Sequence, residues 1–201
     1  MQDAAVPGPA GHIPVRVYRP PTQGPVPTVV FFHGGGWLTG DLDSHDDVAR
    51  RLCRDVEAVV VAVDYRLSPE HPFPAGYDDC LAAARHVADH IEDCGARPDR
   101  LALAGDSAGA NLAAVVALDF RDERRPLAAQ LLVYPATDFD GDYPSRTQNT
   151  TGYVLSHQDI LDLQHLYAGD DPAVRSSARV SPLRADSHAG LAPAVIARTT
   201  G

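Results

Sequence analysis

Short apolar runs and helical apolar repeats alternate along the chain. Four runs of strand length are mostly apolar, and they lie at 28–32, 59–63, 101–104 and 130–134. Such runs are typical of strands that are buried on both faces of a parallel sheet. The segment 13–19 alternates apolar with polar residues instead, which predicts a half-exposed strand at the sheet edge. A shorter apolar run at 194–197 predicts a last strand.

Helical segments separate these strands. Ser44 with Asp47, and Ser156 with Asp159, match the capping box that starts a helix. Three apolar positions of a longer helix, predicted over about 75–93, are expected to face the core: Leu81, Val87 and Ile91. The alternation of strands and helices predicts an α/β protein with a mostly parallel sheet and helices on both faces. No repeat or linker is visible, so we expect residues 1–201 to form a single domain.

Composition narrows the possible chemistry. The chain has 201 residues, 17 basic against 27 acidic, and a formal charge of -10. Every basic residue is Arg, which excludes Schiff-base chemistry, a Ser/Lys dyad and a P-loop. No basic run is dense enough for nucleic acid, and no apolar run is long enough to span a membrane. Cys53, Cys80 and Cys94 are an odd number without C-x-x-C spacing, so we expect reduced thiols and a cytoplasmic protein.

A sharp turn is predicted where the strand at 101–104 meets a helix. Residues 105–109, GDSAG, match the G-x-S-x-G pattern, with Ser107 at the apex. Glycine at both flanks lets strand and helix approach closely, while the serine is exposed at the head of the helix. This arrangement suits a nucleophile, because helix N–H groups face the charge that develops during attack on a carbonyl. A purely structural glycine-rich turn is the alternative interpretation.

A second glycine-rich segment follows the strand at 28–32. It reads His33-Gly34-Gly35-Gly36-Trp37, and glycines in succession lose much backbone freedom on ordering, so something must require them. We predict that the N–H groups of Gly34 and Gly35 form an oxyanion hole with the N–H of Ala108. A flexible or phosphate-binding loop is the alternative, although the Lys or G-x-G-x-x-G spacing of phosphate loops is missing.

The proline-rich loop at 64–74 carries four further polar candidates. Asp64, Arg66, Glu70 and His71 could be catalytic on residue type alone. We expect them instead to form a hydrogen-bonded network that stiffens a loop beside the site.

Three of these segments together resemble the hormone-sensitive-lipase-like branch of the α/β-hydrolase superfamily. They are HGGGW at 33–37, DYRLSPEHPFPA at 64–75 and GDSAGANL at 105–112, and the similarity extends over nearly the whole chain. Members of this branch are serine esterases and lipases that use no cofactor and no metal. The resemblance therefore implies the α/β-hydrolase fold and a small-molecule ester as substrate. It also implies Ser107 as nucleophile, with Gly34, Gly35 and Ala108 as the oxyanion hole.

The sequence departs from this branch at both ends. The N-terminal helical cap of the family is not found, and the Asp-Pro-Leu motif and the His that complete the triad are expected beyond Gly201. We therefore expect a partial domain that lacks the C-terminal strand and helices and is inactive alone. The alternative is a triad that uses Asp138 with His157, His165 or His188. A second possible function is a non-catalytic binding protein on the same fold. The oligomeric state stays open.

Overall fold

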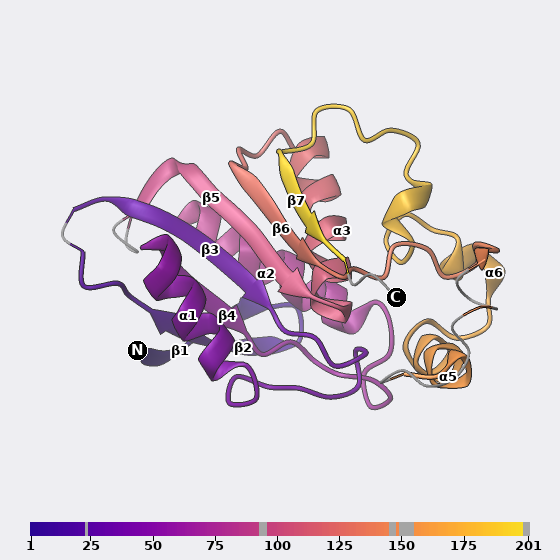
Figure 1. Ribbon diagram of the computed structural model, residues 1–201. Coiled ribbons are helices and arrows are strands. Elements are labelled where there is room, and N and C mark those ends of the chain that lie inside the picture. The colour runs from indigo at the N-terminus through magenta and orange to yellow at the C-terminus, as the bar shows by residue number, and fades with distance from the viewer. Residues whose placement is uncertain (23, 93–95, 145–147, 149–154, 199–201) are drawn as a thin grey trace.

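The computed structural model describes residues 1–201 except 23, 93–95, 145–147, 149–154 and 199–201. The described strands form one seven-stranded sheet in the order β1-β2-β4-β3-β5-β6-β7 (Figure 1). The strand bounds are β1 Gln2–Gly8, β2 Gly11–Tyr18, β3 Val26–Phe32, β4 Val59–Val63, β5 Ala96–Asp106, β6 Ala129–Val133 and β7 Ala194–Ala197. Every predicted strand is present, and the mostly parallel sheet is confirmed, because β4, β3, β5, β6 and β7 run parallel to one another.

The prediction of an edge strand at 13–19 is wrong. β2 is the second strand, because β1 pairs with it antiparallel on its outer side and β4 pairs with it antiparallel on the other. β1 has no apolar run: among its residues only Val6 is buried. Backbone pairing and a tight turn to β2 hold this strand in place, and neither leaves a hydrophobic pattern in the sequence.

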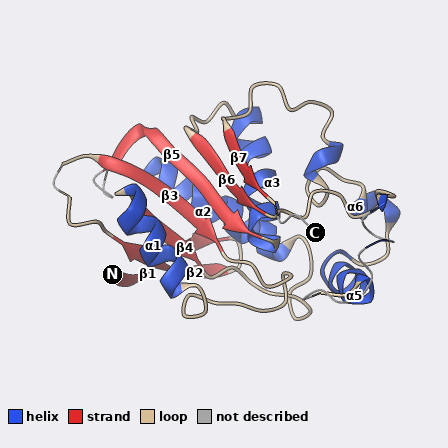
Figure 2. Ribbon diagram, viewed as in Figure 1, coloured by secondary structure: helices blue, strands red, loops and turns tan. Residues whose placement is uncertain are grey.

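Helices cover both faces of the sheet (Figure 2). Helix α1 (Asp46–Val56) lies on one face, and α2 (Ala75–Asp89) and α3 (Ala108–Asp122) lie on the other. The larger apolar core joins α2 and α3 to the sheet, and a smaller core lies under α1. The central strands are thus apolar on both faces because both faces are covered. Three further elements lie to one side of the sheet in Figure 1: α5 (His157–Ala168), α6 (Pro172–Arg175) and a 3₁₀ turn at Pro182–Arg184.

The predicted helix starts have different outcomes. Ser156 and Asp159 form the expected capping box of α5. The capping box predicted for Ser44 and Asp47 is wrong, because the N-cap of α1 is His45 and no side chain caps that helix. The helix predicted over about 75–93 ends at Asp89, so Leu81 and Val87 are buried positions of α2, while Ile91 is buried just beyond its end.

Strand β7 lies at the open end of the sheet. Its four residues are all exposed, and Val195 and Ile196 keep 65% and 61% of their accessible surface. Cys53 and Cys80 are free and buried, while Cys94 lies outside the described residues. Within the described chain, no helix has both the length and the apolar composition needed to cross a bilayer.

Candidate active site

Ser107 occupies a strained turn between β5 and α3. Its backbone has φ 53 and ψ -117, a left-handed conformation that residues with a Cβ rarely adopt. The turn is tight enough that a Cβ at Gly105 would overlap the backbone of Gly109, and a Cβ at Gly109 would overlap the carbonyl oxygen of Phe32. The predicted need for glycine on both sides of the serine is therefore confirmed. The Ser107 side chain is partly exposed at the head of α3.

The glycine loop lies next to this turn because β3 and β5 are parallel neighbours. Phe32, the last residue of β3, pairs in register with Gly105. The carboxyl ends of both strands therefore meet at one edge of the sheet, and residues 33–36 follow directly after β3. Gly35 has φ +120 and Gly36 has φ +62, so both adopt backbone conformations that favour glycine.

Hydrogen bonds fix two successive peptide units of this loop. The His33 carbonyl accepts from the Tyr65 hydroxyl at 2.7 Å, and the Gly34 N–H donates to Asp106 Oδ1 at 3.0 Å. The next carbonyl, that of Gly34, lies 2.7 Å from His33 Nδ1. Since N–H and C=O point in opposite directions across a trans peptide, holding the Gly34 carbonyl also fixes the direction of the Gly35 N–H.

The three predicted oxyanion donors are therefore not equivalent. The Gly34 N–H is engaged by Asp106. The N–H groups of Gly35 and Ala108 have no hydrogen-bond partner among the described residues. Ala108 is the first residue of α3, where backbone N–H groups lack intrahelical partners. The assignment of Ser107 as nucleophile and of Gly34, Gly35 and Ala108 as oxyanion donors stays a prediction, with the geometry favouring Gly35 and Ala108.

His33 is held neutral by its surroundings. Its side chain is buried, and its ring stacks on Tyr65 with centroids 4.4 Å apart. Burial lowers the pKa of His33 below its ordinary value, because the charged ring would lose its hydration. With the Nδ1 proton donated to the Gly34 carbonyl, Nε2 is an unprotonated buried nitrogen without a hydrogen-bond partner among the described residues. His33 thus supports the loop.

The predicted network in the loop at 64–74 forms around one residue only. Arg66 binds Asp79 of α2 in a two-pronged contact, with Nε at 2.8 Å from Oδ2 and Nη2 at 2.9 Å from Oδ1. The side chains of Asp64, Glu70 and His71 make no hydrogen bond within the described part of the chain, so the prediction is wrong for them. Tyr65, which neighbours Arg66, is the supporting residue that the sequence did not reveal.

The alternative triad acid, Asp138, has other partners. It accepts from Arg184 Nε at 2.7 Å and from the Tyr143 hydroxyl at 2.8 Å. Burial of Asp138 acts to raise its pKa, but these donors and the Asp140 N–H outweigh that effect and hold the pKa below its ordinary value. The carboxylate therefore belongs to a polar cluster with Arg184.

The three histidines of the alternative triad lie elsewhere. His157 is the first residue of α5. His165 Nδ1 lies 2.7 Å from Asp170 Oδ1, and His188 Nε2 lies 2.9 Å from the Pro182 carbonyl. Across the described ranges, no hydrogen bond joins a histidine to Asp138 or to the Ser107 hydroxyl. The described residues also contain no group of three or more His, Cys, Asp or Glu side chains that could hold a metal ion.

Comparisons with known proteins agree with this fold. The family model of the alpha/beta hydrolase fold matches residues 29–200. The chain is 46% identical to the carboxylic ester hydrolase LipN of Mycobacterium tuberculosis, with 98% of this chain and 54% of LipN aligned. It is 38% identical to the ethyl acetate hydrolase of Pseudomonas putida, with 92% and 60% aligned. The chain thus spans a little over half the length of these two curated relatives.

Solved structures are similar over nearly all of this chain. The esterase of Pyrobaculum calidifontis superposes with a TM-score of 0.91 at 40% identity, covering 97% of this chain and 65% of that one. EstE1, a thermostable carboxylesterase from a metagenomic library, superposes with a TM-score of 0.91 at 33% identity. That match covers 100% of this chain and 78% of EstE1.

Proposed function

The chain belongs to the hormone-sensitive-lipase-like branch of the α/β-hydrolase superfamily, and from this membership we propose that it carries out carboxylic ester hydrolysis through an acyl-enzyme on Ser107. One observation carries the proposal. The strained, partly exposed serine at the head of α3 follows Asp106, which binds the Gly34 N–H, and the neighbouring N–H groups of Gly35 and Ala108 have no partner among the described residues. Such donors are what a developing oxyanion requires.

In this reaction the Ser107 oxygen attacks the carbonyl carbon of a small-molecule ester. The carbonyl oxygen becomes an oxyanion, which accepts hydrogen bonds from the Gly35 and Ala108 N–H groups near the positive end of α3. Collapse of the tetrahedral intermediate breaks the bond to the alcohol, which leaves with a proton, and an acyl-serine remains. Water then releases the acid and restores the hydroxyl. No cofactor enters either step.

The proton of Ser107 needs a base. No hydrogen bond reaches the Ser107 hydroxyl from the part of the chain that is described. Loss of a triad member in a serine hydrolase costs on the order of 10⁴ to 10⁶ in kcat. We therefore propose that the 201-residue chain alone turns over esters slowly. This same observation favours a second candidate function, a binding protein that holds an ester without cleaving it.

The compartment that we propose is the cytoplasm. Burial raises the pKa of the Cys80 thiol well above its ordinary value, so this cysteine stays protonated and unreactive. Cys53 is also free and buried, and free thiols are typical of a reducing compartment.

A fluorophosphonate probe tests the nucleophile directly. The 201-residue chain should be labelled slowly, because no base reaches the Ser107 hydroxyl among the described residues, and Ser107→Ala should abolish even this labelling while leaving the circular dichroism spectrum unchanged. Ser187→Ala, which removes an exposed serine on a loop, is the matched control and should be labelled normally. Labelling retained in folded Ser107→Ala would contradict the assignment. Saturable ester binding without any Ser107-dependent labelling or turnover would favour the binding function for this chain.

A further inference from the structure

Asp106 links the nucleophile turn to the glycine loop. It precedes Ser107 directly, and its Oδ1 accepts the Gly34 N–H at 3.0 Å. A Cβ at Gly34 would overlap Asp106 Oδ2, so the two residues are in close contact. The orientation of this carboxylate therefore decides how the peptide between His33 and Gly34 is held.

His45 lies beside the same carboxylate. Its Nε2 is 3.5 Å from Asp106 Oδ1, and the two side chains keep only 20% and 18% of their accessible surface. A carboxylate removed from water to this extent keeps one orientation only when polar groups surround it. Tyr134 lines the same cavity of about 250 Å³ as Asp106 and His45.

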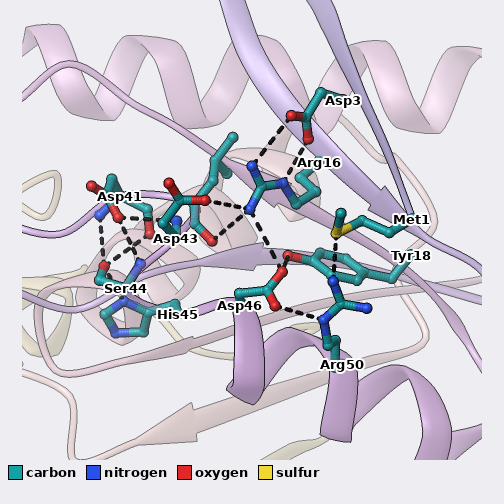
Figure 3. Close-up of polar contacts among 11 residues, drawn as sticks. Met1, Asp3, Arg16, Tyr18, Asp41, Asp43, Ser44, His45, Asp46 and Arg50 are labelled. Atoms are coloured by element: carbon teal, nitrogen blue, oxygen red, sulfur yellow. Dashed lines mark hydrogen bonds and ion pairs between the residues drawn. The ribbon is translucent and has the colours of Figure 1, made fainter.

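The other ring nitrogen of His45, Nδ1, also has a hydrogen-bond partner. Nδ1 lies 3.0 Å from Ser44 Oγ, and Ser44 closes a turn by donating its N–H to Asp41 Oδ1 at 2.6 Å (Figure 3). When the Ser44 hydroxyl donates to Nδ1, the neutral ring carries its proton on Nε2. When the ring is protonated, both nitrogens carry a proton. In both of these states an Nε2–H group faces Asp106, whereas a neutral ring carries its proton on Nδ1 when the Ser44 hydroxyl donates to the Asp41 carbonyl, 3.0 Å away.

The loop that carries His45 is anchored to the sheet. Arg16 of β2 binds Asp43 with its Nη1 at 2.7 Å from Oδ1, and the Tyr18 hydroxyl donates to Asp46 at 2.8 Å (Figure 3). His45 is therefore fixed from three directions: by Ser44, by the sheet beneath the loop and by the ring of His33, whose centroid is 5.4 Å away. A side chain held in this way can impose an orientation on a neighbour.

We propose that His45 is a positioning residue of the oxyanion loop: through Asp106 it holds the Gly34 N–H and, with it, the loop that presents the Gly35 N–H. This role rests on the proposed esterase function, because it serves the same loop. His45 itself touches no reacting atom. It also caps no helix with its side chain, so replacing it removes no helix cap.

Two substitutions at this position separate positioning from simple packing. His45→Gln keeps an N–H donor at about the reach of Nε2, and His45→Leu keeps bulk without a donor. In the 201-residue chain, amide hydrogen exchange followed by NMR should show Gly34 exchanging about tenfold faster in His45→Leu, the factor that one net hydrogen bond represents. Val30 in β3 should be unchanged, and His45→Gln should resemble the parent. His71→Leu, at an exposed histidine whose side chain makes no hydrogen bond among the described residues, is the matched control.

Acylation of Ser107 by p-nitrophenyl acetate supplies a second measurement. His45→Leu should lower the acylation rate constant about tenfold with little change in KM, because misplacing the loop weakens contacts made in the transition state. Equal Gly34 exchange in parent and His45→Leu, or His45→Gln as impaired as His45→Leu, would overturn the proposal. If His45→Leu does not fold, Ser44→Ala replaces it, because this variant keeps the His45 ring but removes the partner of Nδ1. Unchanged Gly34 exchange in Ser44→Ala would then overturn the proposal. Absence of Ser107-dependent acylation in the parent would overturn the esterase function alone, since amide exchange needs no chemistry.

Discussion

Tyr65 holds both the backbone and the ring of His33. Its hydroxyl donates to the His33 carbonyl at 2.7 Å, and its ring stacks on the imidazole at an angle of 15°. Both side chains are buried. Burial raises the pKa of Tyr65 well above its ordinary value, so the phenol keeps its proton and remains a donor. The strand end at β4 thereby supports the first residue of the glycine loop.

Tyr65→Phe should cost about 1–3 kcal/mol in the free energy of unfolding, because the buried His33 carbonyl loses its donor while the stacked rings stay. Urea denaturation, followed by the fluorescence of Trp37, the one tryptophan of the chain, measures this loss. Tyr143→Phe is the matched control: its acceptor, Asp138, still has Arg184, so a loss below about 0.5 kcal/mol is expected. Equal losses of unfolding free energy in the two variants would show that the buried Tyr65 hydrogen bond stabilises the fold no more than the exposed Tyr143 hydrogen bond does.

The parts of the fold that the sequence predicts are those that bury continuous apolar surface. β3, β4, β5 and β6 lie in the middle of the sheet, so each carries a mostly apolar run. β1 is held by backbone pairing to β2 and was missed for that reason. At α1, Ser44 bonds to the Asp41 turn instead of capping the helix, because serine side chains also stabilise local turns.

The sequence likewise predicts some residues of the candidate site and misses others. The glycines are recognisable because a positive φ at Gly35 and Gly36 and close backbone contacts at Gly105 and Gly109 leave no place for a Cβ, and Ser107 is recognised by its position between the last two. The residues that support them are not, because each acts across a long separation in sequence: Gly34 and Asp106 are 72 positions apart, and His33 and Tyr65 are 32 apart. Only the folded sheet brings these pairs together.

Gly35→Ala should lower kcat for Ser107-dependent hydrolysis of p-nitrophenyl acetate by ~10²-fold or more, the usual cost of losing one oxyanion donor. The substitution places a Cβ against the Thr39 carbonyl at a φ of +120, so the Gly35 N–H must turn away. KM should change much less, because the ground-state ester makes little use of this donor.

Gly11→Ala is the control for backbone strain. Gly11 has φ +131 but no heavy atom within 4 Å of an added Cβ, so it tests the same conformational cost away from the site. It should lower stability without changing kcat. A rise in KM with constant kcat in Gly35→Ala would identify the loop as a pocket wall.

Arg66→Met should cost about 3 kcal/mol in the free energy of unfolding, because it leaves the buried Asp79 carboxylate without its cation. Arg51→Met is the control, since Arg51 pairs with Asp47 where the side chains keep 65% and 74% of their surface, and its loss should stay below about 1 kcal/mol. Adding Asp79→Leu to Arg66→Met should recover part of the stability, because the unpaired charge is then gone. Urea denaturation of the three variants checks this order, and similar losses for Arg66→Met and Arg51→Met would refute it.

Asp138→Asn should destabilise the protein at neutral pH and lose that effect in acid. The folded state holds the pKa of Asp138 below its ordinary value of 3.8, so the carboxylate contributes stability above that pH and loses it as the pH falls through the lowered pKa. Two donors, Arg184 and Tyr143, hold the charge, and since Arg184 keeps 36% of its surface we expect a loss of about 1–2 kcal/mol at pH 7. Urea denaturation at pH 7, 5 and 3 should show that the difference in unfolding free energy between parent and variant shrinks below pH 3.8.

Asp142→Asn is the control, at an exposed residue without hydrogen bonds among the described residues, and it should show no such difference at any of these pH values. If folded Asp138→Asn instead lost most of its Ser107-dependent ester hydrolysis, Asp138 would be identified as the acid of a Ser107 triad.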